Sequence, residues 1–336
     1  MEFLTGLMNA MPGAVAQGLV WGIMAIGVYI TYKILDIADL TVDGSLCTGG
    51  AVCVILTLNG APVWLAFSMA FVAGLLAGMV TGVLHTEFGI PPILAGILTQ
   101  LGLYSVNLHI MGWGTDNGSK SNLPISVDKY NLLLSARYVR DLSLKNPIVI
   151  LVIFIVLTIA ILYWFFGTEL GAALRATGAN GNMARAQGIN TNGAKILGLM
   201  ISNGFVALSG ALLSQYQGFS DINMGRGAIV IGLAAVIIGE VVFSKIFHNF
   251  SLKLVACVLG AVIYYVVIQF VLRLGLSTDD LKLLSALVVA LFLALPYWKS
   301  KYFTKPAKKA AKKPVKKVVE EDDDDYDDDE FEEIDD

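Results

Sequence analysis

Long apolar stretches recur along this chain, and they decide what it can fold into. An α-helix needs about 20 apolar residues to cross the hydrocarbon core of a bilayer. The stretches are residues 13–35, 45–59, 63–85, 91–109, 147–167, 194–217, 226–243, 254–272 and 282–298. Backbone polar groups inside lipid must be satisfied within their own segment, so these stretches form helices. The sequence therefore predicts an all-α polytopic membrane protein with about nine transmembrane helices.

The second stretch, 45–59, is short and contains Gly49 and Gly50. It fits either a full crossing or a half-helix that neighbouring helices, rather than lipid, support. Residues 1–12 are expected to form a short surface helix. Glycines spaced four apart, as in the run at positions 74, 78 and 82, predict helices whose backbones approach each other closely.

Charge is concentrated at the end of the chain. Residues 299–336 hold nine of the 23 basic residues and fourteen of the 27 acidic residues. We expect a transmembrane domain over 1–298 and a disordered tail over 299–336 that is first lysine-rich and then acidic. The tail lysines favour a cytoplasmic C-terminus under the positive-inside rule. Loops 36–44, 86–90, 168–193 and 244–253 would then face the cytoplasm.

Loop 168–193 differs from an ordinary connector between membrane helices. It is polar and rich in Gly and Asn, and it lies between two strongly apolar segments. It is interpreted as a small helical element displayed at the membrane surface. Met183, Ala184 and Ile189 would be apolar knobs among polar neighbours, and such an element suggests docking to a soluble partner.

The sequence lacks the motifs of an enzyme. No GxxxxGK[ST] phosphate loop, HExxH motif or hydrolase arrangement occurs, and the three histidines and three cysteines are scattered. We therefore expect no catalytic residues and no metal site, and any ATP hydrolysis would belong to a separate chain.

Ionisable residues within the apolar stretches are few. Glu240 lies near the inner end of its stretch, where a local ion pair with Lys245 is expected rather than a proton relay. No carboxylate or histidine is expected deep in the membrane, where ion-coupled transporters commonly need one. This argues for an energy source outside the chain.

The polar residues within the stretches are mainly neutral. Thr99, Gln100 and Asn107 lie on one expected helix, with Gln100 and Asn107 seven residues apart on one face, and Asn203 lies on another. These four side chains either line a translocation path or form hydrogen bonds between helices, and the sequence supports both readings equally.

Three segments resemble the permeases of ABC importers of the branched-chain amino acid and ribose type. The first is GLVWGIMAIGVYITYKILDIADLTVDGSLCTGGA, whose matching positions are Gly18, Leu19, Ala25, Gly27, Tyr32, Gly44, Gly50 and Ala51. The others are RATGANGNMARAQGINTNGAKILGLMISNGFVALSGALLS and GFSDINMGRGAIVIGLAAVIIGE. Within this family the likeness is nearest to permeases of tryptophan/tyrosine transport systems.

The resemblance implies a type II importer permease fold and a place in the bacterial cell membrane. Two permease subunits, expected as a homodimer, would pair around a central path, embedded in membrane lipid. Each would carry a coupling helix that docks on an ABC ATPase subunit. By match to the family's loop, this helix comprises Asn180, Gly181, Asn182, Met183, Ala184, Arg185, Gly188 and Ile189.

The resemblance also implies the remaining partners. ATP and Mg would bind to the partner ATPase, with no cofactor in this chain, and an extracytoplasmic substrate-binding protein would deliver the solute. No nucleic acid partner is expected. The substrate would be a small solute such as an amino acid, with an aromatic one favoured. The alternatives are an ion-coupled secondary transporter or channel, and a membrane scaffold that transports nothing.

Overall fold

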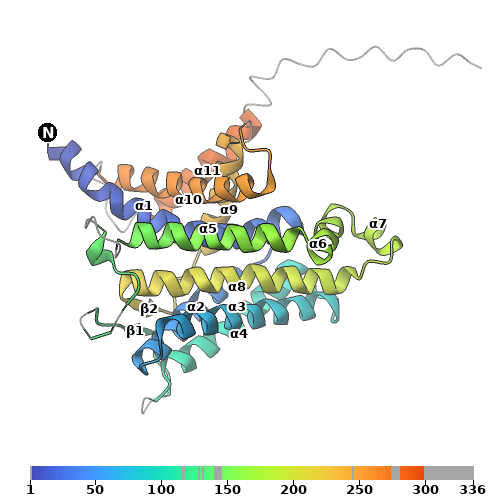
Figure 1. The fold of residues 1–336 in the computed structure, drawn as a ribbon, viewed down its shortest axis with the longest axis horizontal. Coiled ribbons are helices and arrows are strands. Elements are labelled where there is room, and N and C mark those ends of the chain that lie inside the picture. Colours follow the sequence, from blue (N-terminus) through green and yellow to red (C-terminus); the bar gives the residue numbers. More distant parts are fainter. Residues whose placement is uncertain are drawn as a thin grey trace, which may run out of the picture. The chain divides into compact units, whose positions relative to one another are not determined.

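The computed structural model describes residues 2–114, 118–127, 129–130, 132–139, 146–243, 246–273 and 281–298. The expected tail, 299–336, lies outside the described residues. Residues 1–297 form one compact unit built almost entirely of helices (Figure 1).

The helices and strands occur in the following order along the chain, and the long helices coincide with apolar stretches. They are α1 (Glu2–Tyr29), the π-helical turn η1 (Ile30–Ile34), α2 (Thr41–Leu58), α3 (Val63–Thr86), α4 (Pro92–Met111), β1 (Asn122–Pro124), the 3-10 turn η2 (Ala136–Tyr138), α5 (Pro147–Phe166), α6 (Glu169–Ala179), α7 (Gly181–Ala186), α8 (Thr191–Gln217), β2 (Phe219–Asp221), α9 (Ala228–Phe243), α10 (Phe250–Arg273) and α11 (Leu281–Trp298).

The helix lengths confirm a polytopic membrane protein. Within the described ranges, seven helices are long and apolar enough to cross a bilayer: α1 with η1, α2, α3, α4, α5, α8 and α10. Helix α9 is apolar but has only 16 residues. The expected number of nine crossings is therefore not confirmed.

Two expectations for the first third of the chain can be compared with the structure. The separate surface helix over 1–12 is wrong, because α1 continues unbroken from Glu2 through Pro12 to Tyr29. The short second stretch forms α2, which begins at Thr41. Of the residues of α2, 72% are buried within the protein. Neighbouring helices therefore surround most of α2.

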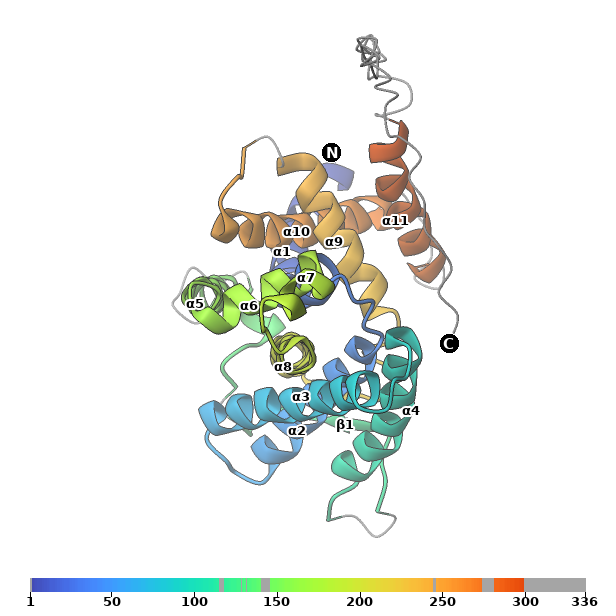
Figure 2. The same cartoon turned by 90° about the vertical axis from the view of Figure 1, so that its right-hand side faces the viewer.

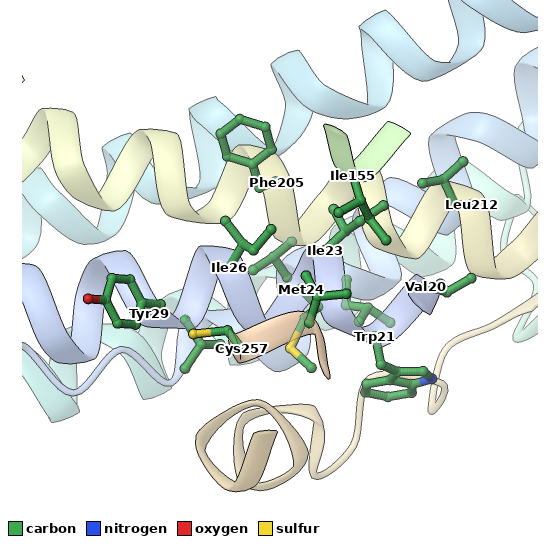
Figure 3. Packing of buried hydrophobic residues seen from close by; sticks show 14 of the residues in the cluster. Val20, Trp21, Ile23, Met24, Ile26, Tyr29, Ile155, Phe205, Leu212 and Cys257 are labelled. Carbon is green, nitrogen blue, oxygen red and sulfur yellow. The ribbon is translucent and has the colours of Figure 1, made fainter. Parts of the chain in front are cut away.

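Helix α8 is the centre of the bundle. It packs against α3, α2 and α1, and α1 in turn packs against α10 and α9. Figure 2 looks along α8 and shows it between α3 with α2 on one side and α1 on the other. The core combines side chains from these helices (Figure 3). Its members include Val20, Trp21, Ile23, Met24, Ile26 and Tyr29 of α1, Ile155 of α5, Phe205 and Leu212 of α8, and Cys257 of α10.

Glycines allow the neighbours of α8 to approach its backbone. A Cβ atom added at Gly74 or Gly78 of α3 would overlap a carbonyl of α8, and one at Gly82 would lie 2.9 Å from the Cα of Ile196. Helix α2 makes the same kind of contact, since a Cβ at Gly49 would overlap the carbonyl of Ala207. The close packing predicted from four-residue glycine spacing is confirmed for α3.

The two ends of the bundle carry different structures. At one end α6 and α7 connect α5 to α8, and at the other β1 pairs with β2 in antiparallel register, with Leu123 opposite Ser220 (Figure 1). Helix α8 has 27 residues. Its rise separates the two ends by about 40 Å.

We expect Gly49→Ala to lower the melting temperature of the detergent-solubilised protein. The added methyl group meets the α8 backbone, and overpacking of this kind costs about 1–3 kcal/mol. Gly102→Ala is the matched control, because Gly102 is also helical and has no neighbouring atom within 4 Å of an added Cβ. Equal melting temperatures for the two variants would contradict the close contact of α2 with α8.

Candidate functional site

Three polar side chains organise the loop between α5 and α8 into helices. The Thr168 hydroxyl accepts a hydrogen bond from the backbone N–H of Gly171 (3.4 Å) at the start of α6. Asn180 Oδ1 accepts from the Met183 N–H (3.0 Å) at the start of α7, and Asn190 Oδ1 accepts from Gly193 (3.0 Å) at the start of α8. Each side chain satisfies a backbone donor that the helix itself leaves free.

Gly188 ends α7. Its φ of 81° lies in the left-handed region that glycine adopts without strain. The Gly188 N–H donates to the Arg185 carbonyl (3.0 Å), and the Ile189 N–H donates to the Ala184 carbonyl (3.0 Å). This pattern is a common C-terminal cap of helices. The Asn and Gly residues of the loop therefore define a short helix with fixed ends.

The face of α7 that is displayed differs from the one expected. Met183 is 64% exposed, whereas Ala184 is only 3% exposed. The interpretation of Ala184 as an apolar knob is therefore wrong, because α7 packs on α6 and α8 and turns Ala184 toward its own chain. Ile189 is half-buried.

The other residues expected in the coupling helix lie on or beside α7. Gly181 and Asn182 begin it, with Asn182 exposed, and the exposed Arg185 donates through Nη2 to the Thr191 hydroxyl (3.2 Å). Whether this surface docks on an ATPase stays a prediction.

A buried carboxylate that the sequence analysis missed joins the first loop to α8. Asp39 is 2% exposed. Its Oδ1 accepts from the Thr41 N–H (2.9 Å), and its Oδ2 accepts from Asn203 Nδ2 (2.6 Å). Asn203 Oδ1 in turn accepts from the Ser45 hydroxyl (2.7 Å). Asp39 follows a helix end, where a solvated acidic residue is the ordinary expectation, so only the three acidic residues in DIADLTVD hinted at it.

Three threonine hydroxyls extend the hydrogen-bonded cluster around Asp39 across the bundle. The hydroxyls of Thr41 and Thr81 lie 2.7 Å apart, and Thr81 donates to Thr99 (2.9 Å). The chain of hydroxyls links α2, α3 and α4. Of the four candidate path residues, Thr99, Asn107 and Asn203 have hydrogen-bond partners on other helices; Asn107 Nδ2 donates to the Gly44 carbonyl of α2.

Two of the path candidates, Gln100 and Asn107, face a cavity. It has a volume of about 130 Å³ and lies between α2, α4 and the segment that joins β2 to α9. Its lining comprises Asp43, Gly44 and Cys47 of α2, Gln100, Leu101, Tyr104 and Asn107 of α4, and Ile222 and Arg226 of the joining segment. The seven-residue spacing of Gln100 and Asn107 explains why both reach it. Whether the four candidates line a translocation path stays a prediction.

Asp43 holds the joining segment against α2. Its Oδ2 accepts from the Gly227 N–H (2.9 Å), and its Oδ1 accepts from the Ile229 N–H (2.9 Å). The Cys47 thiol donates to the Ile222 carbonyl (3.2 Å), and its Sγ accepts from the Gly225 N–H (3.2 Å). A carboxylate on α2 thereby caps the start of α9 across 184 residues of sequence.

Glu240 of α9 forms an ion pair with a residue that is distant in the sequence. Lys33 Nζ of η1 lies 3.1 Å from a carboxylate oxygen of Glu240. Lys245, the partner expected from the sequence, lies outside the described residues. The expected pair of Glu240 with Lys245 therefore stays a prediction, while a partner 207 positions away has no local pattern by which the sequence could reveal it. Among the described residues, no three His, Cys, Asp or Glu side chains gather closely enough to hold a metal ion.

Comparison with known proteins identifies similar chains. The family model for the permease component of branched-chain amino acid transport systems matches residues 11–296. A tyrosine transport system permease protein of Clostridioides difficile (strain R20291) is 42% identical over 287 residues, which cover 85% of this chain and 91% of the relative. An uncharacterized protein of Rickettsia prowazekii (strain Madrid E) is 36% identical over 86% of this chain and 97% of its own.

A more distant relative is the autoinducer 2 import system permease protein LsrC of Yersinia pseudotuberculosis serotype IB (strain PB1/+). It is 29% identical over 223 residues, which cover 65% of this chain and 58% of the relative. No solved structure matches the chain.

Asp39 predicts a pH dependence of stability. Burial raises the pKa of its carboxyl group, against the opposing effect of the hydrogen bonds from Thr41 and Asn203. The folded protein thus binds this proton more tightly than the unfolded chain does. The contribution of Asp39 to stability is full below the unfolded pKa and is lost as the pH rises through the folded pKa.

We therefore expect Asp39→Asn to flatten the decline in melting temperature as the pH rises from about 4. Asp36→Asn is the control, because Asp36 is an exposed carboxylate in the same loop. The measurement is the melting temperature of the three proteins across pH. Parallel curves for wild type and Asp39→Asn would show that Asp39 does not bind its proton more tightly in the folded state.

Proposed function

The chain belongs to the family of permease components of branched-chain amino acid transport systems. We therefore propose that it carries an amino acid across the bacterial cell membrane, and we favour an aromatic amino acid as the substrate. It is a membrane transport subunit of an ABC-type system rather than an enzyme. The observation that carries the proposed substrate is the 42% identity to a tyrosine transport system permease protein over 85% of this chain.

We propose that the subunit has the type II importer permease fold with nine crossings. Helices α9 and α11 would add to the seven that are long and apolar enough by themselves. Two copies would pair around the path. Helix α4 supports this pairing, because only 22% of the residues in its apolar 18-residue window are buried within one chain. Its exposed face is apolar and includes Leu94, Leu98 and Leu101.

We propose that α7 is the coupling helix on which the ATPase docks. Its capped ends give it a fixed shape, and Met183 offers an exposed apolar contact. ATP and Mg²⁺ would bind to the ATPase, and nucleotide-driven movement of that subunit would reach this chain through α7. The opposite end of the bundle, where β1 pairs with β2, would receive the substrate-binding protein.

The test is reconstitution of the permease in liposomes with the ATPase subunit and the substrate-binding protein. We expect uptake of L-tyrosine that needs ATP and the loaded binding protein. An ion-coupled transporter, which the buried carboxylate of Asp39 would suit, would instead respond to an imposed ion gradient without ATP. A scaffold would show no uptake in either experiment.

We expect Met183→Asp to uncouple ATP hydrolysis from uptake in this assay. A carboxylate placed in a packed interface has no partner there, and an unpaired buried charge costs about 3–5 kcal/mol. Phe88→Asp is the control, because Phe88 is 71% exposed and lies in the loop between α3 and α4, outside the helices long enough to cross the membrane. Normal coupling in Met183→Asp would remove Met183 from the docking surface. Ala184→Asp is unsuitable here, because Ala184 is buried in its own chain.

The orientation of the chain, with a cytoplasmic C-terminus and α7 inside, is tested by cysteine labelling in intact cells. Met183→Cys should react with an impermeant thiol reagent only after the membrane is opened, whereas Lys120→Cys should react from outside. Both positions are exposed, and the three native cysteines are buried. The reverse pattern would invert the topology and exclude α7 as a cytoplasmic docking element.

A further inference from the structure

We propose that the cavity between α2, α4 and the segment 222–227 binds the charged head group of an amino acid during transport, with Arg226 receiving the carboxylate. This inference rests on the proposed function and adds to it a binding site with a stated chemistry. Three observations support it: a cation without an ion-pair partner among the described residues, a buried acceptor without a hydrogen-bond partner, and the size of the cavity.

The first observation is the charge at Arg226. Arg226 is one of the residues that line the cavity and is itself exposed, and the structure gives its side chain no hydrogen bond and no ion pair among the described residues. The nearby carboxylate of Asp43 already accepts two backbone N–H groups. Arg226 therefore remains free to bind an anion. A guanidinium has five N–H donors in a planar fork that matches a carboxylate with two parallel hydrogen bonds.

The second observation is an orphaned acceptor. Asn107 is 1% exposed. Its Nδ2 donates to the Gly44 carbonyl at 3.4 Å, while its buried Oδ1 has no hydrogen-bond partner. Buried polar atoms are almost always paired, so this oxygen is available to accept from a donor in the cavity that Asn107 lines. An ammonium group provides three donors.

The acidic side of the cavity favours the same ligand. Each oxygen of the Asp43 carboxylate uses one lone pair for a backbone N–H, and an ionised carboxylate has about four acceptor positions in total. Asp43 and Asn107 therefore offer acceptors, and Arg226 offers donors, around one small space. An α-amino acid has the complementary pair of groups, a carboxylate and an ammonium on the same carbon.

The third observation concerns size. A volume of about 130 Å³ accommodates several water molecules or a small head group. Two of the lining residues, Leu101 and Tyr104 of α4, are 64% and 44% exposed. A large side chain would extend past these two residues, toward the apolar face of α4. The cavity would thus recognise the head group common to amino acids and place little demand on the side chain.

The test uses the complete complex of permease, ATPase and substrate-binding protein in liposomes, with L-tyrosine as the probe. We expect Arg226→Gln to reduce the tyrosine transported per ATP hydrolysed by about tenfold or more, since a charge-assisted hydrogen bond is lost. Lys120→Gln is the matched control, because it removes the same charge from an exposed position outside the cavity, and it should transport at the wild-type ratio.

Two further variants separate recognition from a structural role. Arg226→Lys keeps the positive charge and should recover part of the ratio, and Asn107→Leu keeps the volume of the side chain and should lower the ratio. A wild-type ratio in Arg226→Gln would overturn the inference, as would an Arg226→Lys variant no better than Arg226→Gln. A wild-type complex that imports no tyrosine with ATP would instead overturn the proposed function itself.

Discussion

The close contact of α8 with the backbones of its neighbours is the constraint on which the rest of the structure depends. Side chains are absent where Gly49 meets the Ala207 carbonyl and where Gly74 and Gly78 meet carbonyls of α8. Lipid tails are as apolar as leucine, so helices in a membrane associate through packing and hydrogen bonds rather than through exclusion of water. The same approach brings Asn203 of α8 within reach of Asp39. The close helix packing and the buried hydrogen bond between Asp39 and Asn203 therefore both result from the position of α8.

The sequence predicted most helices because lipid allows few alternatives. Residues 63–85 were expected and α3 spans Val63–Thr86; the stretch 194–217 became α8 over Thr191–Gln217. Local hydrogen bonds also made the short helix α7 predictable, since the Asn and Gly residues at its ends form hydrogen bonds with backbone groups only a few positions away. Gln100 and Asn107 reached one cavity because helical periodicity fixes which residues share a face.

What the sequence could not reveal depends on distant parts of the chain. Asp43 caps α9 from 184 residues away, and Lys33 pairs with Glu240 from 207 residues away. Neither link has a local pattern. Asp39 appeared to be a loop residue because its burial is created by α8, and Ala184 appeared exposed because its burial is created by the fold of α7 on α6 and α8. Hydrophobicity predicts which segments enter the membrane, while the polar contacts between segments come only from the tertiary structure.

These contacts also restrict how the subunit can move. Helix α8 is joined to α1 by hydrogen bonds from Ser202 to the Gly27 carbonyl (2.7 Å) and from Ser209 to the Val20 carbonyl (2.8 Å). Sliding α8 past α1, α2 or α3 would break buried hydrogen bonds or drive backbone atoms together, and packed interiors do not deform continuously. The exposed face of α4 has no such restraint, and its residues Leu101 and Tyr104 line the cavity. In the proposed pairing of two copies, these restraints favour movement of whole subunits against each other over rearrangement within one.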